Sequence, residues 1–281
     1  MALGFSEKHP ISSSEKLSIK YHNIFDYPLT KEELHKWRAS LQNFKTNNLL
    51  LEYKNDFYFL KGREIIVKKR KQREKYSGKK LKIAKKAAKL LEKISLVKFI
   101  GITGALAMNN AGVHSDIDLM IITKCGKLWT TRLFVYLLLK ITGYKLRSPH
   151  LKNEKDKLCI NMWLDENDLI WNKKDRNIYT AHEIAQIVPL IDKKNTFEKF
   201  LSKNKWVLNY WPYATTIEYK GNNKDMENEY VSKIEQVAYY LQRFYMGSKI
   251  TREIVTPKRA IFHPNDWGKI VISKLGENLQ K

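Results

Sequence analysis

The chain has 281 residues, 43% of them hydrophobic and 29% charged, which is enough to bury a sizeable core and excludes wholesale disorder. It has no apolar run of the roughly 20 residues that a membrane-spanning helix needs, no secretory signal pattern at its start, and only two cysteines, which excludes a disulfide scaffold. The formal net charge is +23, and we expect a cytoplasmic protein with reduced thiols and no membrane span.

The sequence pattern of residues 14–62 predicts a small helical module that ends in a β-hairpin. Thr30 followed by Glu33 forms a capping box that opens a helix, and two short apolar runs flank the polar turn Lys54–Asp56. The run IFDYPLTKEELHKW with its hairpin resembles the winged-helix modules that precede certain nucleotidyltransferase domains. Residues 39–48, where a recognition helix would lie, contain few basic residues, so packing or protein contact is at least as well supported as DNA reading.

The positive charge is concentrated in residues 61–98, which hold 16 basic and 3 acidic residues. We assign 63–96 to a basic linking helix, which Gly78 is expected to kink or break. Its second half has one apolar stripe at helical spacing, formed by Ile83, Ala87, Leu90 and Ile94. Two interpretations stay open: a helix that packs by this stripe with solvated lysines, or a face that binds nucleic acid or an anionic membrane. Only 10 of the 52 basic residues in the chain are arginine, which weighs against direct phosphate contact.

Residues 97–192 predict a sheet with helices, and residues 193–281 predict a helical C-terminal region. The predicted strands are Val97–Gly104, Ile117–Thr123 and Leu158–Leu164. The predicted helices are a buried, leucine-rich helix over Leu128–Ile141, then Ala181–Val188, Thr196–Leu208, Asn228–Met246 and a short last helix within 249–281.

A glycine turn and a pair of carboxylates connect the first two of these strands. Gly104 and Ala105 follow the first strand, and after ten residues Asp116-Ile117-Asp118 opens the second. Residues i and i+2 of a strand project from the same face, so Asp116 and Asp118 point together while Ile117 enters the core. Two adjacent carboxylates repel each other unless a cation lies between them, and such hard oxygen ligands suit Mg²⁺ or Mn²⁺. The glycine turn offers backbone N–H groups that a phosphate can approach without meeting a Cβ.

This run, GALAMNNAGVHSDIDLMII, resembles the signature of the DNA polymerase beta nucleotidyltransferase superfamily, and the chain is similar to an uncharacterised nucleotidyltransferase-like family within it. The resemblance covers about residues 97–168. It implies an α+β fold with an N-terminal winged-helix-like module, a nucleotidyltransferase-type mixed sheet flanked by helices, and a helical C-terminal region. It also implies that Asp116 and Asp118 bind the metal and take part in catalysis. The nucleotide-binding residues that it implies are Gly101, Thr103, Gly104, Ala105 and Ser115.

Two positions depart from the superfamily pattern. The glycine is usually followed by a phosphate-binding serine, and the loss of that hydroxyl at Ala105 removes about 1.5–3 kcal/mol of charged hydrogen bonding, which Thr103 can partly replace. The third carboxylate of active members corresponds to Asn161, whose neutral side chain cannot act as a general base. Asp165 lies roughly 13 Å further along the strand and Asp156 faces the opposite side, so neither is a natural substitute.

We therefore expect a metal-dependent nucleotidyltransferase that moves an NMP from an NTP to an unidentified acceptor hydroxyl, with Asp116, Asp118 and Asn161 at the catalytic centre. The alternative is a catalytically impaired protein of this fold that acts as a nucleotide- or nucleic-acid-binding module. Asn161, Ala105 and the basic segment 61–98 favour that alternative. A DNA-binding regulator is a third interpretation, which the arginine-poor recognition region disfavours.

Overall fold

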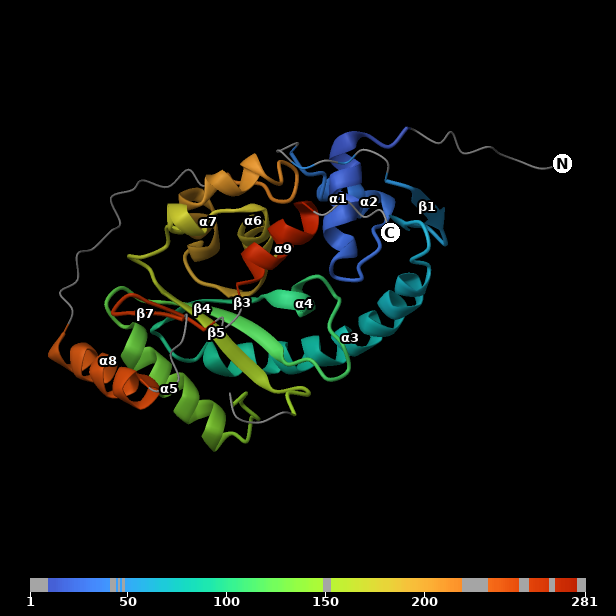
Figure 1. Cartoon of the computed structure of the whole chain (residues 1–281). Helices are drawn as coiled ribbons and strands as arrows, with labels where there is room; N and C mark the ends of the chain where they lie inside the picture. Colours follow the sequence, from blue (N-terminus) through green and yellow to red (C-terminus); the bar gives the residue numbers. More distant parts are fainter. Residues whose placement is uncertain are drawn as a thin grey trace.

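A six-stranded sheet lies at the centre of the molecule (Figure 1). The structure is a computed structural model, and it describes residues 10–40, 44, 46, 49–148, 153–218, 232–247, 253–262 and 266–276. The strand order is β6-β3-β4-β5-β8-β7, in which β4 and β5 are parallel and the other neighbours are antiparallel. The strands are β3 Val97–Ile102, β4 Ile117–Thr123, β5 Leu158–Asp165, β6 Val188–Asp192, β7 Ile254–Thr256 and β8 Arg259–Ile261. The expectation of a mixed α+β sheet flanked by helices is confirmed.

The two faces of the sheet are covered by different helices (Figure 1). Neighbouring residues of a strand point to opposite faces, so Met120 packs with the first group of helices and Ile121 with the second. The first group is α6 Ile178–Ala185, α7 Thr196–Lys203 and α9 Trp267–Gly276. The second is α3 Ile65–Leu91, α5 Leu128–Ile141 and α8 Lys233–Met246.

The N-terminal helices and hairpin form where local signals predict them. They are α1 Ser13–Asn23, α2 Lys31–Lys36, β1 Leu51–Lys54 and β2 Phe57–Leu60. The Thr30 hydroxyl accepts the N–H of Glu33 at 3.3 Å, and Glu33 accepts the N–H of Thr30 at 2.9 Å, which completes the capping box. Asn55 and Asp56 adopt positive φ in the hairpin turn, a conformation that these residues tolerate. The expected recognition region, 39–48, lies largely outside the described residues.

The basic helix α3 is a single helix that lies within the predicted bounds 63–96. It continues through Gly78, so the expected break there is wrong. A glycine inside a helix costs about 1 kcal/mol, which tertiary packing on both sides of it outweighs. The predicted stripe packs on the core: Ala87 is fully buried, and Ile83, Leu90 and Ile94, which follows the helix end, are partly buried against the same cluster. The fully buried apolar residues in this half are Ala84, Ala87, Ala88 and Leu91.

Several C-terminal predictions need correction. The helix predicted over Ala181–Val188 ends at Ala185, and Val188 begins the edge strand β6. The helix predicted over Thr196–Leu208 ends at Lys203 and is followed by a 3₁₀ turn. The region 193–281 is not purely helical, because its hairpin β7–β8 extends the central sheet next to β5. These strands are three residues long, too short to show an alternating pattern.

Helix α5 has the predicted bounds, but it is not a fully buried helix. Four of its large apolar side chains are more than half exposed, namely Leu133, Phe134, Leu137 and Ile141. No helix in the described part of the chain combines the length and apolarity that crossing a bilayer requires.

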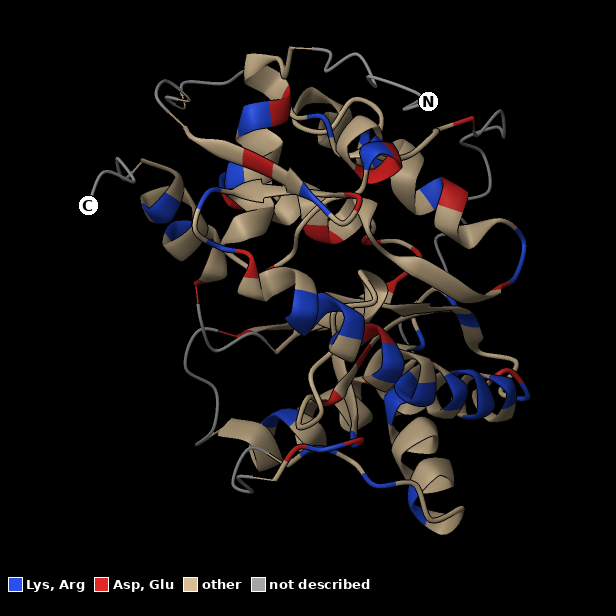
Figure 2. Ribbon diagram, turned by 90° about the vertical axis from the view of Figure 1, so that its right-hand side faces the viewer, with Lys and Arg blue, Asp and Glu red and all other residues tan. Residues whose placement is uncertain are grey.

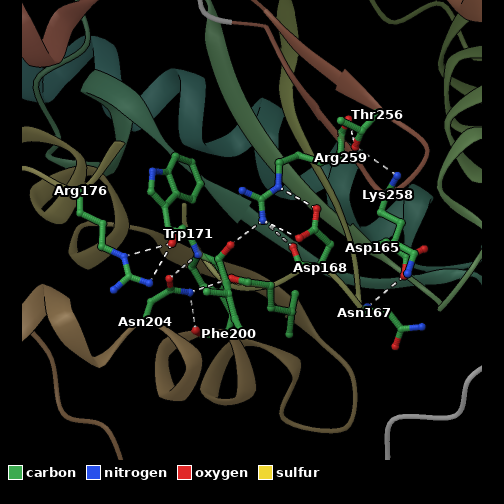
Figure 3. A network of polar contacts seen from close by, with 12 residues as sticks. Asp165, Asn167, Asp168, Trp171, Arg176, Phe200, Asn204, Thr256, Lys258 and Arg259 are labelled. Carbon is green, nitrogen blue, oxygen red and sulfur yellow. Dashed lines mark hydrogen bonds and ion pairs between the residues drawn. The ribbon is translucent and has the colours of Figure 1, made fainter. Parts of the chain in front are cut away.

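Arg259 of β8 joins the C-terminal hairpin to the loop after β5 (Figure 3). Its guanidinium donates to the Asp168 carboxylate at 2.9–3.0 Å and to the carbonyl of Ile170 at 2.7 Å. Asp165 starts the same loop and accepts the N–H groups of Asn167, at 2.9 Å, and of Gly126, at 2.7 Å. Asp165 therefore holds two loops together at the end of β5, away from the polar centre of the sheet.

The hydrophobic core crosses the domain limits 14–62, 63–96, 97–192 and 193–281 that we expected from the sequence. Lys20 of α1 is buried and donates to the carbonyl of Leu275 in α9 at 2.7 Å. Arg70 of α3 pairs with Glu33 at 2.6 Å, and its side chain is 7% exposed. The N-terminal module is thus anchored to both α3 and α9, and this anchoring encloses the cavity described next.

Candidate functional site

A cavity of about 410 Å³ lies between the carboxylate-bearing end of the sheet and the helices α1 and α6. The sheet side contributes the predicted polar residues, Thr103, Gly104, Ala105, Asp116, Asp118 and Asn161. The opposite wall comes from the N-terminal module and from α6, with Tyr21, His22, Phe25, Tyr179, His182 and Glu183. Residues from four separate parts of the sequence therefore meet in one site.

Asp116 and Asp118 lie together at the base of this cavity. Asp118 is the second residue of β4 and Asp116 precedes the strand, while Ile117 between them is fully buried. One oxygen of each carboxylate lies within 4.8 Å of the other and of the Cys159 thiol sulfur. Burial raises the pKa of Asp118 to about 7, and the negative charge of Asp116 adds to the rise. Two buried carboxylates this close together repel each other when both are ionised. A cation bound between them would remove this repulsion.

Asn161 lies beside Asp118 because of an irregularity in the pairing of β4 and β5. Asp118 pairs with Cys159, but the register shifts after Leu119, so that Asn161 is the additional residue on β5. Its Nδ2 donates to Asp118 Oδ1 at 2.7 Å. Its Oδ1 is buried and has no hydrogen-bond partner among the described residues.

The glycine turn faces Asp118. Gly104 has a φ of +60°, and a Cβ at this position would lie 2.6 Å from Asp118 Oδ2. Only glycine fits both the backbone conformation and this close approach. The Thr103 hydroxyl, next to it, is also buried without a hydrogen-bond partner in the described structure. Both unpartnered atoms belong to residues of the cavity wall, where a ligand can satisfy them.

Gly104→Ala is expected to destabilise the protein more than Gly143→Ala. Gly143 also has a positive φ, +77°, but apart from its chain neighbours no atom of the described residues lies within 4 Å of its added Cβ. Both variants carry the left-handed penalty of about 1–2 kcal/mol, and only Gly104→Ala also collides with Asp118. Urea denaturation measures the difference. Equal losses from the two variants would show that the Gly104 turn does not press against the carboxylate.

Two predicted nucleotide-binding residues do not reach the cavity. Gly101 lies within β3, where a Cβ would approach Phe99 and Ile187 to 2.7 Å, so this glycine serves packing. The Ser115 hydroxyl accepts the N–H of Gly112 at 2.9 Å and closes the loop before β4. Ala105 lines the cavity but offers no hydroxyl.

Arg147 and Glu154 line the same cavity and had no sequence signal. Arg147 Nη1 lies 3.1 Å from Asp116 Oδ2, and its Nη2 lies 2.8 Å from Glu154 Oε1. The guanidinium opposes the rise that burial causes in the pKa of Asp116. Arg147 thus supplies one positive charge next to the carboxylate pair.

Glu183 of α6 is the second group that the sequence did not indicate. Its Oε1 accepts from Gln186 Nε2 at 2.7 Å. Burial raises the pKa of Glu183 to about 8, and the charge of Asp118 contributes to the rise. A carboxyl group with such a pKa can hold or release a proton near neutral pH.

A pair of histidines completes the wall opposite the sheet. His22 Nδ1 donates to the carbonyl of Ser18 at 2.8 Å, and His22 Nε2 lies 3.1 Å from His182 Nε2. Burial lowers the pKa of His22 to about 4, so the ring is neutral at pH 7 and its Nε2 accepts from His182. The two residues are 160 positions apart in the sequence, which is why no local motif signals the pair.

Helix α3 makes up most of the basic segment 61–98, and Lys and Arg are concentrated along its ribbon (Figure 2). Arg70 and Lys80 are buried within the protein, and Lys80 donates to the carbonyl of Ser115 at 2.7 Å. The exposed lysines of the helix are Lys68, Lys69, Lys71, Lys75, Lys79, Lys82, Lys85, Lys86 and Lys89.

Comparisons with known proteins do not assign this site. No protein-family model matches the chain, and no curated protein matches it. Its function is therefore inferred from the geometry of the cavity.

Proposed function

We propose that the chain is a metal-dependent nucleotidyltransferase that moves an NMP from an NTP to an acceptor hydroxyl. The observation that carries this proposal is the convergence of Asp116, Asp118 and the Gly104 turn at the base of one cavity. The resemblance to the DNA polymerase beta nucleotidyltransferase superfamily supports the proposal for these three groups, but not for Gly101 and Ser115, which do not line the cavity. The winged-helix-like assignment of the N-terminal module belongs to the same proposal.

The residues present fit a divalent cation. Asp116 and Asp118 offer carboxylate oxygens close together, and Asn161 offers a buried oxygen without a partner. Asp116 and Asp118 would hold Mg²⁺ or Mn²⁺, which when bound neutralises charge on the triphosphate.

The protein's own groups would bind the nucleotide and position the acceptor. The backbone of the Gly104 turn and the unpartnered Thr103 hydroxyl would donate to phosphate oxygens, and Arg147 would add a positive charge. The aromatic side chains of Tyr21 and Tyr179 provide an apolar wall for a planar base.

Asn161 cannot accept the proton of the acceptor hydroxyl. Glu183 lies on the same cavity wall, and its carboxylate would take that proton; because its pKa is about 8, this base form predominates only above about pH 8. Release of pyrophosphate then balances the transfer of the NMP.

The test is label transfer from α-labelled NTPs with Mg²⁺ or Mn²⁺, with the protein itself, total RNA and a cell lysate as acceptors. The native protein is expected to transfer label to an acceptor. The control variant Asp192→Asn, which changes an exposed carboxylate on β6, is expected to transfer it equally. The double variant Asp116→Asn/Asp118→Asn is expected to transfer none. Glu183→Gln is expected to retain metal-dependent NTP binding but to lose at least about 10²-fold in rate, the lower end of general base catalysis.

If the native protein neither transfers label nor binds NTP in a metal-dependent way, the proposed nucleotidyltransferase activity is excluded. The second candidate is then a nucleic-acid-binding module, which the exposed lysines of α3 favour. Its binding should weaken steeply as salt rises, because phosphate contacts release counterions.

A further inference from the structure

Cys159 is a part of the metal site that neither the motif nor the proposed function uses. It lies on β5 directly opposite Asp118 in the register of the two parallel strands, and its side chain is buried. Its sulfur lies within 4.8 Å of one oxygen of both Asp116 and Asp118. Cys159 pairs with Asp118 in the register, and Asn161, at the register shift, donates to Asp118, so both side chains lie on the side of the carboxylates.

A second observation points to a ligand at this position. Asn161 is 6% exposed, its amide nitrogen is engaged by Asp118, and its amide oxygen has no hydrogen-bond partner among the described residues. A buried oxygen without a partner is costly unless something binds it. The cluster therefore presents two carboxylates and one sulfur within 4.8 Å of one another, and the adjoining Asn161 adds a buried oxygen without a partner.

We propose that this cluster binds a thiophilic divalent transition ion, such as Zn²⁺ or Co²⁺, in preference to Mg²⁺, with Cys159 as a direct ligand. Mg²⁺ takes oxygen ligands, whereas a thiolate selects softer ions. The inference rests on the proposed function in sharing Asp116 and Asp118, and it replaces Mg²⁺ by a thiophilic ion as the preferred ion of the site.

Charge and protons balance in this site. The thiol of Cys159 loses one proton to solvent when the ion binds, since the thiolate is the ligand. The guanidinium of Arg147, 3.5 Å from the sulfur and 3.1 Å from Asp116 Oδ2, offsets the added negative charge. Two carboxylates and one thiolate then face one divalent ion and one arginine.

The experiment is a titration of metal-free protein with Co²⁺, read by absorption, with two matched cysteine variants. Cys125 is buried too, but it does not line the cavity, and it contacts Asn167 beyond the end of β4. The native protein and Cys125→Ser are expected to show a thiolate-to-cobalt charge-transfer band that saturates at one ion per chain and that excess Mg²⁺ does not displace. Cys159→Ser is expected to show no band and to bind Co²⁺ at least about tenfold more weakly, because loss even of an outer-sphere partner costs 10–100-fold.

X-ray absorption at the zinc edge of the native protein keeps the inference testable if Cys159→Ser does not fold. One sulfur scatterer in the first shell is expected, and a shell of oxygen and nitrogen alone would overturn the inference. Co²⁺ bound without a charge-transfer band, or displaced by equimolar Mg²⁺, would also overturn it.

These outcomes separate the inference from the proposed function. Label transfer with Mg²⁺ and no sulfur ligand would overturn the inference and leave the nucleotidyltransferase proposal standing. A sulfur-ligated ion in a protein that neither transfers NMP nor binds NTP in a metal-dependent way would support the metal site and overturn the proposed reaction.

Discussion

Asp118→Asn is expected to abolish metal-dependent NTP binding and, at the same time, to stabilise the metal-free protein. The variant removes one of the two carboxylates that would hold the metal, while Asn at this position can still accept the hydrogen bond that Asn161 donates to Asp118 at 2.7 Å. The gain in stability follows from the pKa of Asp118, about 7 in the folded protein and about 3.9 in an unfolded chain. The folded state therefore binds this proton more tightly than the unfolded state does.

The sign of the pH dependence follows from this difference. The contribution of Asp118 to stability is complete below about pH 4 and is lost as the pH rises to about 7, because the folded protein must then hold a buried charge. At pH 8 we expect Asp118→Asn to raise the free energy of unfolding by about 2–4 kcal/mol, given about 1.4 kcal/mol per pKa unit. At pH 4 the two proteins should be equally stable.

Chemical denaturation in the presence of a chelator, at pH 4 and pH 8, measures this effect. Asp165→Asn is the matched control, because Asp165 is also buried and its pKa is raised, to about 6, but it holds loops at the far end of β5. That control should retain metal-dependent NTP binding. An Asp118→Asn protein that binds Mn²⁺ and NTP as tightly as the native protein would remove Asp118 from the site.

Asn161→Asp is expected to tighten Mg²⁺ binding and to weaken the metal-free fold. The native amide donates to Asp118, and its replacement by a carboxylate turns that attraction into repulsion among three acidic groups. We expect at least a tenfold gain in Mg²⁺ affinity, and at pH 8 a loss of about 2 kcal/mol in the free energy of unfolding without metal. If the third carboxylate also activates the acceptor, as the superfamily resemblance implies, the transfer rate should rise by about 10²-fold.

Isothermal titration with Mg²⁺ and denaturation with a chelator test this prediction, with Asn161→Ala as the control that removes the amide without adding charge. The control should bind Mg²⁺ no more tightly than the native protein. Unchanged Mg²⁺ affinity in Asn161→Asp would mean that position 161 does not face the bound ion.

Elements with a strong local pattern were predictable to the residue. Strand β4 and helix α5 have the predicted bounds, because a continuous apolar strand and a long leucine-rich helix are recognised without knowledge of their neighbours. The capping box at Thr30 and the polar hairpin turn are equally local, since they join groups within four residues. The prediction that Asp116 and Asp118 point to the same side depends only on the alternation of side chains along a strand.

Elements stabilised by distant partners were not predictable. Strand β6 contains Pro189 and follows α6 without a turn signal, and it forms because β3 offers an open edge. The helix α3 continues through Gly78 because it packs against the sheet at one end and the N-terminal module at the other. In both cases tertiary contacts exceed a local preference of about 1 kcal/mol.

The candidate site likewise contains residues that the sequence predicts and residues that only the tertiary structure brings together. The acidic pair and the glycine turn come from one continuous run of the sequence, so their spacing predicts their meeting in space, whereas Asn161 lies beside Asp118 through the irregular pairing of β4 and β5. The opposite wall does not: His22 meets His182 across 160 residues, and Glu183 faces the carboxylates because α6 packs beside α1. The raised pKa of Asp118 and of Glu183 likewise comes from burial, which depends on how all these segments close over the cavity. Residue types and local periodicity can propose a metal-binding pair, but desolvation is a property of the assembled fold.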